Sequence, residues 1–92
     1  MLTLELTKQY RKDYNRLKRR GADFSKLNYV LKKLLNEEQL EEKYQDHALK
    51  GDLQGFRECH VTPDWLLVYA IDKGKLILTA SQTGTHSDIF GK

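Results

Sequence analysis

The sequence predicts an α+β domain in which a helix hairpin packs on one face of a mainly antiparallel, four-stranded sheet. Three observations support this class: apolar and polar residues alternate at the N-terminus, two successive segments have helical periodicity, and the C-terminal half has three β-like segments separated by turn residues. The expected element order is β-α-α-β-β-β. With 92 residues, of which 39% are hydrophobic, the chain can build one modest core, so residues 1–92 are expected to form a single domain.

The N-terminal half contains the first strand and both helices. Leucines alternate with polar residues over residues 2–6, which is the period of a strand with one buried face. A basic helix is expected over residues 7–20, with a threonine at its N-cap and a glycine directly after it. A second helix, capped by Asp23 or Ser25, runs to about residue 36 and carries its apolar side chains on one side.

The C-terminal half predicts a three-stranded meander. Residues 37–44 are polar and acidic, and form either a further helical turn or a frayed connection. Residues 43–55 form a long loop, and loops of this length in a small domain are usually functional or hold local structure. Residues 66–71 are apolar on both faces, so their strand is expected inside the sheet. The strands are expected at residues 56–61, 65–71 and 75–81, with Asp72-Lys73-Gly74 as the second turn.

Cysteine content and the length of the apolar runs exclude several classes of protein. Cys59 is the only cysteine, which excludes an internal disulfide and any CxxC motif. No apolar run of residues reaches membrane-spanning length and the alternating N-terminal segment is too short for a signal segment, so a soluble, cytoplasmic protein is expected.

The net charge is only +3, but basic side chains concentrate in residues 8–20. Such a face suits phosphates, although a merely solvated helix surface is the ordinary alternative.

A tight turn at residues 61–64 organises the candidate site. A proline presets the first central dihedral of this turn, so His60 ends one strand just before Asp64 and Trp65 begin the next. Antiparallel neighbours reverse direction at each turn, so the end of the last strand, followed by His86, is expected at the same edge of the sheet.

His47 lies in the long loop, which can bring it to this edge, although the sequence does not force that placement. Two or three imidazoles with a carboxylate are what acid–base chemistry near neutral pH requires. Two other classes of function stay open. The first is a non-catalytic RNA- or DNA-binding module, which the basic helix favours. The second is a metal site built from the three histidines and Asp64, although their spacing matches no compact zinc motif.

Three stretches of the chain closely resemble the YafQ toxins of the RelE/ParE superfamily. They are Asp46-His47-Ala-Leu-Lys50-Gly51, the run from Gly55 through His60-Val-Thr-Pro-Asp64-Trp65 to Tyr69, and Thr83-Gly-Thr-His86-Ser-Asp-Ile-Phe90-Gly91. The resemblance implies a RelE-like fold and a type II toxin: a ribosome-dependent endoribonuclease that cleaves mRNA in the ribosomal A site and is silenced by a cognate antitoxin. The alternative within the superfamily is the ParE branch, which poisons gyrase and is not a nuclease.

The resemblance also implies roles for individual residues. His47, His60, Asp64 and His86 would form the catalytic set, and Phe90 would contact the mRNA base near the scissile phosphate. No metal or other cofactor is expected, because the nucleotide 2′-OH attacks the adjacent phosphorus and leaves a 2′,3′-cyclic phosphate. His86 is expected to act as the acid, while His60 and His47 share base and phosphate-neutralising roles. Asp64 would orient an imidazole.

Two further side chains, Lys50 and Arg57, are candidates for phosphate contacts. Trp65 is expected in the core instead of stacking on a base. The expected partners are mRNA, 16S rRNA near the A site through the basic helix over residues 8–20, and a cognate antitoxin, with no membrane involved. The sequence leaves open which histidine is the base and which is the acid.

Overall fold

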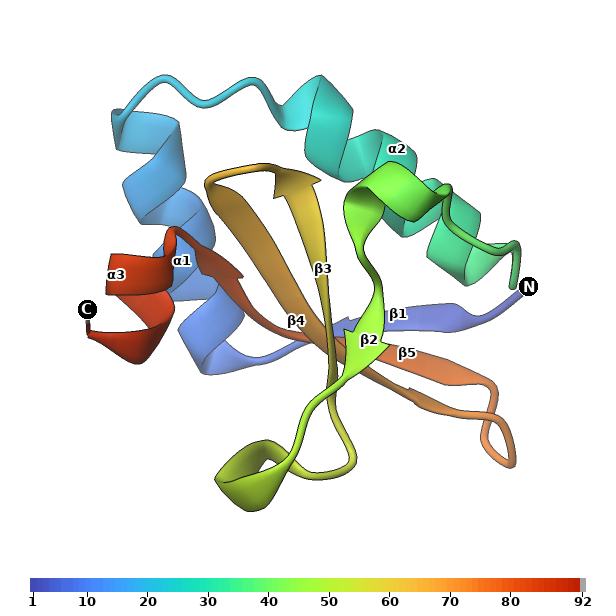
Figure 1. Cartoon of the computed structure of the whole chain (residues 1–92). Coiled ribbons are helices and arrows are strands. Elements are labelled where there is room, and N and C mark those ends of the chain that lie inside the picture. Colours follow the sequence, from blue (N-terminus) through green and yellow to red (C-terminus); the bar gives the residue numbers. More distant parts are fainter. Residues whose placement is uncertain (92) are drawn as a thin grey trace.

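The computed structural model describes residues 1–91 of the chain, and Figure 1 shows its elements. The helices are α1 (Lys8–Arg19), α2 (Phe24–Leu35) and α3 (His86–Phe90), with the 3₁₀ turns η1 (Glu42–Tyr44) and η2 (Gly51–Leu53). The strands are β1 (Thr3–Leu6), β2 (His47–Ala48), β3 (Arg57–Thr62), β4 (Trp65–Asp72) and β5 (Ile77–Gly84).

The strands form one mixed sheet in the order β1-β5-β4-β3-β2. β1 runs parallel to β5, and all other neighbours are antiparallel. The predicted α+β class is confirmed, but the strand count is five instead of four. The extra strand is β2, which has two residues and is therefore too short to show any period in the sequence. It belongs to the long loop of residues 43–55, which holds local structure as expected.

Both main helices begin where their capping residues predict. The Thr7 side chain accepts a hydrogen bond from the Tyr10 amide at 3.0 Å, and Asp23 accepts one from the Ser25 amide at 3.1 Å. In Figure 1 the two helices diverge from the loop that joins them. α1 packs against β5 and α2 against β3, and their buried side chains join those of β4 in a single core.

The prediction of a buried face for the first strand was wrong. Leu2 is buried, but Leu4 and Leu6 are 37% and 36% exposed. β1 is an edge strand of the sheet. The two leucines therefore line a surface groove together with Tyr10 and Tyr14.

The central strand β4 is buried over Trp65–Tyr69, as predicted for the run that is apolar on both faces. Trp65 lies in the core, where its indole donates a 2.7 Å hydrogen bond to the Thr83 hydroxyl and its ring meets Phe24 edge-on. Cys59 is also fully buried, and burial raises the pKa of its thiol to about 12.

The last strand begins later and ends later than predicted. The turn after Asp72 takes up four residues, including Leu76 in a left-handed conformation with φ 57°, so β5 starts at Ile77. β5 then pairs with β4 as far as Gly84, beyond which the chain leaves the sheet and forms α3, a helix that was not predicted. None of the helices in the described part of the chain is both long enough and apolar enough to cross a bilayer.

Candidate functional site

The site is built on the face of β3 that points away from the helices. Cys59 and Val61 belong to the core, so the alternating residues Glu58 and His60 lie on the opposite face. His60 is partly buried, and its Nδ1 lies 3.3 Å from the Pro63 carbonyl oxygen in the turn that follows. This is the turn that the proline predicted, with Asp64 directly before β4.

The short strand β2 brings His47 to the same face. His47 pairs with Glu58 in the sheet register, and its Nε2 lies 3.7 Å from the Glu58 carboxylate. The other ring nitrogen, Nδ1, lies 2.7 Å from the Gln45 carbonyl oxygen. Strand pairing thus fixes a placement that the sequence left open.

Glu58 is a site residue that the sequence analysis missed. Its side chain is only 6% exposed, and one of its carboxylate oxygens lies 4.0 Å from His60 Nε2 as well as near His47. The signal was present in the sequence, because two residues separated by one lie on the same face of a strand. Glu58 thus lies between two imidazoles of the site and faces one ring nitrogen of each.

His86 reaches the cluster from the C-terminal end of β5. It is the first residue of α3, and its ring centroid lies 6.2 Å from that of His60. Phe90, one helical turn later, is 39% exposed and has its ring centroid 5.6 Å from that of His86. The expected convergence of His60 with His86 is therefore present, with Phe90 beside them.

Asp64 is the exception among the expected catalytic residues. It is exposed at the β3–β4 turn, and within residues 1–91 it forms no hydrogen bond or ion pair with His60. The structure brings Glu58 to that imidazole instead. Asp64 remains close to His60 along the chain, since only three residues separate them.

The two expected phosphate ligands differ in their surroundings. Lys50 is exposed directly before η2, and no ion pair involves it in the part of the chain that the structure describes. Arg57 contacts both carboxylate oxygens of Asp46 at 3.3 Å. Asp46 also accepts a hydrogen bond from the buried Tyr69 hydroxyl. Burial and this hydrogen bond raise the pKa of Tyr69. Arg57 and Tyr69 therefore hold the residue that directly precedes His47.

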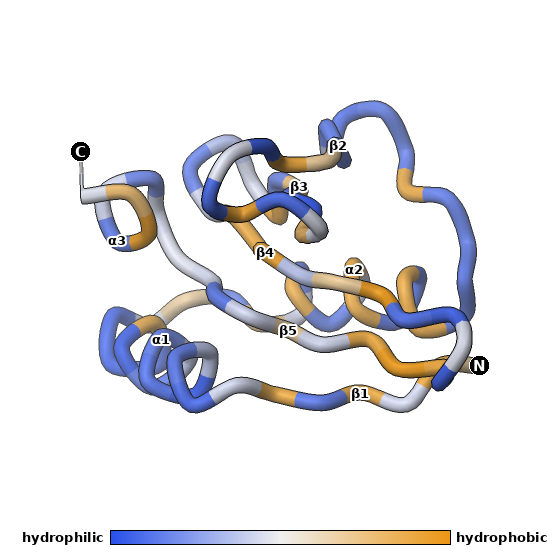
Figure 2. Tube along the Cα trace, turned by 90° about the horizontal axis from the view of Figure 1, so that it is seen from below, coloured by the Kyte–Doolittle hydropathy of each residue, from blue (hydrophilic) through white to orange (hydrophobic). Residues whose placement is uncertain are grey.

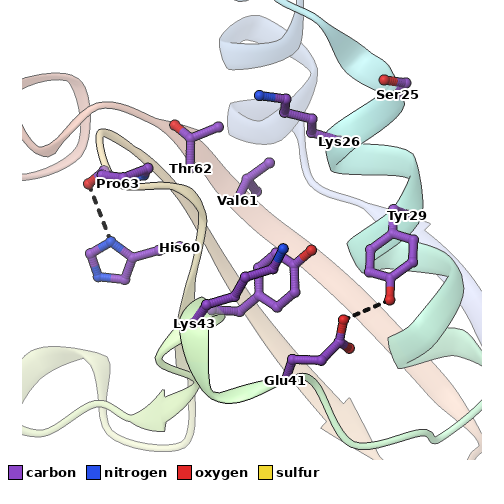
Figure 3. A pocket seen from close by; sticks show the side chains of 10 residues that line it. Ser25, Lys26, Tyr29, Glu41, Lys43, His60, Val61, Thr62 and Pro63 are labelled. Carbon is purple, nitrogen blue, oxygen red and sulfur yellow. Dashed lines mark hydrogen bonds between the residues drawn. The ribbon is translucent and has the colours of Figure 1, made fainter.

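A cavity lies beside this cluster and not at its centre (Figure 3). It measures about 570 Å³ and lies between α2, η1 and the β3–β4 turn, with Tyr29, Lys43 and Val61 among its lining. His60 is the only candidate catalytic residue on its wall. In Figure 3 the imidazole of His60 points away from Tyr29 and toward Pro63. The His47 side chain is 50% exposed and His86 is exposed, so the imidazole cluster is a surface site.

Fold and site together define a small α+β protein with an open imidazole cluster at one end of its sheet. The family model described as a bacterial toxin of type II toxin-antitoxin systems, YafQ, matches residues 2–91. The chain therefore belongs to the YafQ family of bacterial type II toxins.

Individual relatives agree with this assignment. The mRNA interferase toxin YafQ of Escherichia coli strain K12 is 40% identical over 90 residues, which cover 96% of this chain and 95% of the relative. A metal-bound toxin from Helicobacter pylori has a TM-score of 0.92 and 46% identity, covering 98% of this chain and 100% of that chain. The toxin of the E. coli DinJ-YafQ complex has a TM-score of 0.89 and 35% identity, with 99% and 100% covered.

The metal-bound relative raises the question whether this chain has a comparable ligand set. Among residues 1–91, no three His, Cys, Asp or Glu side chains are arranged to hold a metal ion. Glu58 approaches His47 and His60 through the ring nitrogens that a metal would need, so these groups interact with one another instead of converging on an open point. The donor set of the described residues therefore does not fit a metal ion.

Proposed function

We propose that this chain cleaves mRNA at the histidine cluster by acid–base catalysis. As a YafQ-family protein it is a type II toxin with the endoribonuclease activity of an mRNA interferase. The observation that carries the proposal is the gathering of three imidazoles from separate elements: His47 and His60 lie beside the buried Glu58 carboxylate, and His86 lies beside His60. Imidazoles titrate near neutral pH, so one site can contain both a base and an acid.

The proposed reaction needs two proton transfers. A base removes the proton of the nucleotide 2′-OH, and the resulting oxygen attacks the adjacent phosphorus. The bond to the 5′-oxygen of the next nucleotide breaks, and an acid supplies the proton to that oxygen, which leaves a 2′,3′-cyclic phosphate and a 5′-hydroxyl. Only RNA supplies the attacking group.

We assign the acid role to His86 because it stands apart from the carboxylate. His60 and His47 share the base and phosphate-neutralising roles, since both lie within 4.0 Å of the buried Glu58 carboxylate, which can orient their rings. Asp64 is proposed to act on the substrate side of the turn, because no protein group in the described residues engages it. Phe90, exposed beside His86, offers a face on which a base can stack.

Lys50 and Arg57 are proposed to contact phosphates that flank the cleaved bond. Lys50 is exposed on the segment that follows His47, and its ammonium is available to a phosphate. Arg57 is 43% exposed at its side chain, so it can contact a backbone phosphate while it remains paired with Asp46.

The ribosome is proposed as the platform on which the mRNA is cut. α1 is hydrophilic over most of its length in Figure 2, and five of its basic side chains are exposed without an ion pair in the described part of the chain. They are Lys8, Arg11, Lys12, Lys18 and Arg19. This surface is suited to 16S rRNA near the A site, and such a target implies action in the cytoplasm. Replacing Lys8, Lys12 and Lys18 together by alanine should weaken ribosome binding and flatten its dependence on salt.

A cognate antitoxin is the second proposed partner. The related E. coli toxin is found in the DinJ-YafQ complex, and an open catalytic surface in a toxin requires a partner that silences it. Such an antitoxin is expected to cover the histidines or the basic face of α1. Growing bacteria that express the chain should therefore stop growing unless the neighbouring antitoxin is supplied.

The decisive experiment follows cleavage of a ribosome-bound mRNA whose scissile nucleotide carries either a 2′-OH or a 2′-hydrogen. We expect cleavage only with the 2′-OH, a cyclic phosphate end, and the same rate after treatment with a chelator. Cleavage of the deoxy substrate, or activity that a chelator abolishes and zinc restores, would contradict the proposal. Binding without any cleavage would instead favour a non-catalytic nucleic-acid-binding module.

A further inference from the structure

The position of His86 depends on a helix that cannot hold itself in place. α3 has five residues, and isolated helices of this length are unstable in water because nucleation is costly. It contributes no residue to the buried core in the described chain. Its position must therefore come from the side chains that attach it to the rest of the molecule.

The first attachment is local. The Thr85 hydroxyl accepts a 3.1 Å hydrogen bond from the Asp88 amide, and the Asp88 carboxylate accepts a 3.0 Å hydrogen bond from the Thr85 amide. This reciprocal pair is a capping box, which satisfies amides at the start of a helix. Gly84 has φ +150° and lies so close to Asp88 that an added Cβ would be 2.9 Å from its side chain. Asp88 thus fixes the direction in which the chain leaves β5.

The second attachment comes from α1. The Arg20 guanidinium donates two hydrogen bonds to the two Asp88 oxygens, at 2.8 and 3.1 Å, and Arg16 Nε lies 3.8 Å from the same carboxylate. The Asp88 side chain is only 12% exposed. The hydrogen bond from Arg20 is the main reason that the pKa of Asp88 is held well below its usual value.

The third attachment holds the end of β5 to the same helix. Asp13 is 2% exposed, and its carboxylate accepts hydrogen bonds from the Thr83 amide at 3.1 Å and from Arg16 at 2.9 Å. Arg16 therefore lies between the carboxylates of Asp13 and Asp88. These carboxylates accept hydrogen bonds from the amides of the residues directly before and after Gly84.

We infer that Arg16 and Arg20 are positioning residues that act through Asp88 to hold α3, and with it His86, against His60. This inference rests on the proposed function, since it gives a purpose to the placement of His86. It also separates the basic helix into two groups. Arg16 and Arg20 organise the active site, while the unpaired basic residues of the same helix remain available to RNA.

The contacts of Arg16 and Arg20 with Asp88, here called the clamp, are expected to affect the cleavage rate far more than the stability of the domain. Exposed ion pairs contribute little to folding, and Arg20 is 49% exposed. Catalysis is more sensitive, because a displacement of about 1 Å in a catalytic group can reduce a rate by roughly a hundredfold. A five-residue helix that loses its main tether has room for such a displacement.

The test compares Arg20→Ala, Arg20→Lys and the control Lys73→Ala in single-turnover cleavage of ribosome-bound mRNA at saturating protein. Lys73 is exposed in the β4–β5 turn, so its replacement removes one positive charge without touching the site. We expect Arg20→Ala to lose about tenfold to a hundredfold in rate with little change in KM. Arg20→Lys should recover part of the loss, because it keeps the charge but not the two parallel hydrogen bonds. Lys73→Ala should cleave at the wild-type rate.

A modified substrate links the loss to His86. Replacing the bridging 5′-oxygen by sulfur gives a thiolate leaving group, which departs without needing a proton from an acid. If the clamp acts through His86, this substrate should restore the rates of Arg20→Ala and of His86→Ala together. A wild-type rate for Arg20→Ala on the normal substrate would overturn the clamp while leaving the proposed function intact, and so would a loss that sulfur does not rescue. Failure of sulfur to rescue His86→Ala would instead overturn the acid assignment.

Discussion

His47 and His86 each lie near an aspartate that an arginine binds, but only the aspartate near His47 also bonds a buried core side chain. Arg57 grips Asp46 beside His47, and Arg20 grips Asp88 two residues after His86. Asp46 is also tied to the core through the hydroxyl of Tyr69, which is 1% exposed. Asp88 instead caps its own short helix and bonds Arg20, whose side chain is 49% exposed, and it has no hydrogen bond to a core side chain among the described residues.

Because of this difference, we expect one set of contacts to matter mainly for folding and the other mainly for catalysis. The hold on His47 is part of the sheet and its core, so breaking it should destabilise the whole domain. The hold on His86 depends on the half-exposed Arg20 and on a helix with no buried residue, so breaking it should leave the domain folded and the histidine misplaced. The variants below test that division, starting with the largest expected effect.

The first variant removes the catalytic group that the surface clamp holds. His86→Ala should lower the single-turnover rate by roughly a hundredfold to ten-thousandfold, the usual contribution of a positioned proton donor. The wild-type rate should follow a bell-shaped pH profile, since one imidazole must be neutral and another charged, and the variant should lose the limb that reports the acid. Thermal unfolding of the variant should match that of the wild type, because His86 is exposed. A variant that cleaves at the wild-type rate would remove His86 from the reaction.

The comparison also shows which features the sequence could predict. The helix caps at Thr7 and Asp23 and the buried strand β4 depend on residues close together in the chain, and these predictions were confirmed. The pair of Arg20 and Asp88 spans 68 residues, so no local pattern connects its members.

Other misses have different physical causes. β2 has too few residues to produce a period, and the exposed leucines of β1 lie on an edge strand, a position that no single segment encodes. α3 was missed although Thr85 and Asp88 have capping-box spacing, because a helix of one turn gives no apolar stripe. Strand alternation with His60 could have indicated Glu58, but its place beside His47 depends on the pairing of β2 with β3.

The second variant tests the carboxylate that His47 and His60 share. Glu58→Gln keeps the size of the buried side chain and removes its charge. We expect the cleavage rate to fall roughly tenfold to hundredfold, because unit charges about 4 Å apart interact by about 1 to 4 kcal/mol between water and a protein surface. The matched control is Glu5→Gln on the exposed edge strand β1, which should cleave normally. Equal rates for the two variants would show that Glu58 is only structural.

The third variant removes the contacts of Asp46 with Tyr69 and Arg57. Asp46→Ala leaves the buried Tyr69 hydroxyl and the Arg57 guanidinium without their shared acceptor. We expect the free energy of unfolding to fall by about 1 to 3 kcal/mol, the usual cost of an unsatisfied buried polar group. Denaturant titration measures this loss. Asp88→Ala serves as the comparison, and should slow cleavage while changing the unfolding midpoint less. If Asp88→Ala proves the more destabilising of the two, the proposed division between the holds is incorrect.

The smallest expected effect isolates the hydroxyl of Tyr69. Tyr69→Phe keeps the buried ring, so near neutral pH it should lose only about 1 kcal/mol of stability, the net value of one hydrogen bond. Tyr29→Phe is the control, because the Tyr29 hydroxyl bonds Glu41 on the surface, and its change should be smaller.

The pH dependence of this difference provides a stricter test. Burial and Asp46 raise the pKa of Tyr69 in the folded state, so above about pH 10 the phenol ionises in the unfolded chain while it stays neutral in the folded one. The unfolded state then binds fewer protons than the folded state, and the stability that Tyr69 contributes declines as the pH rises through this window. Phenylalanine cannot ionise, so the stability difference between wild type and Tyr69→Phe should narrow above about pH 10. Tyr10 and Cys59, whose pKa values are both raised to about 12, remain in both proteins and cancel from the comparison. A difference that stays constant through the alkaline range would mean that the Tyr69 hydroxyl titrates as freely as one in water, and that Asp46 is not anchored to the core.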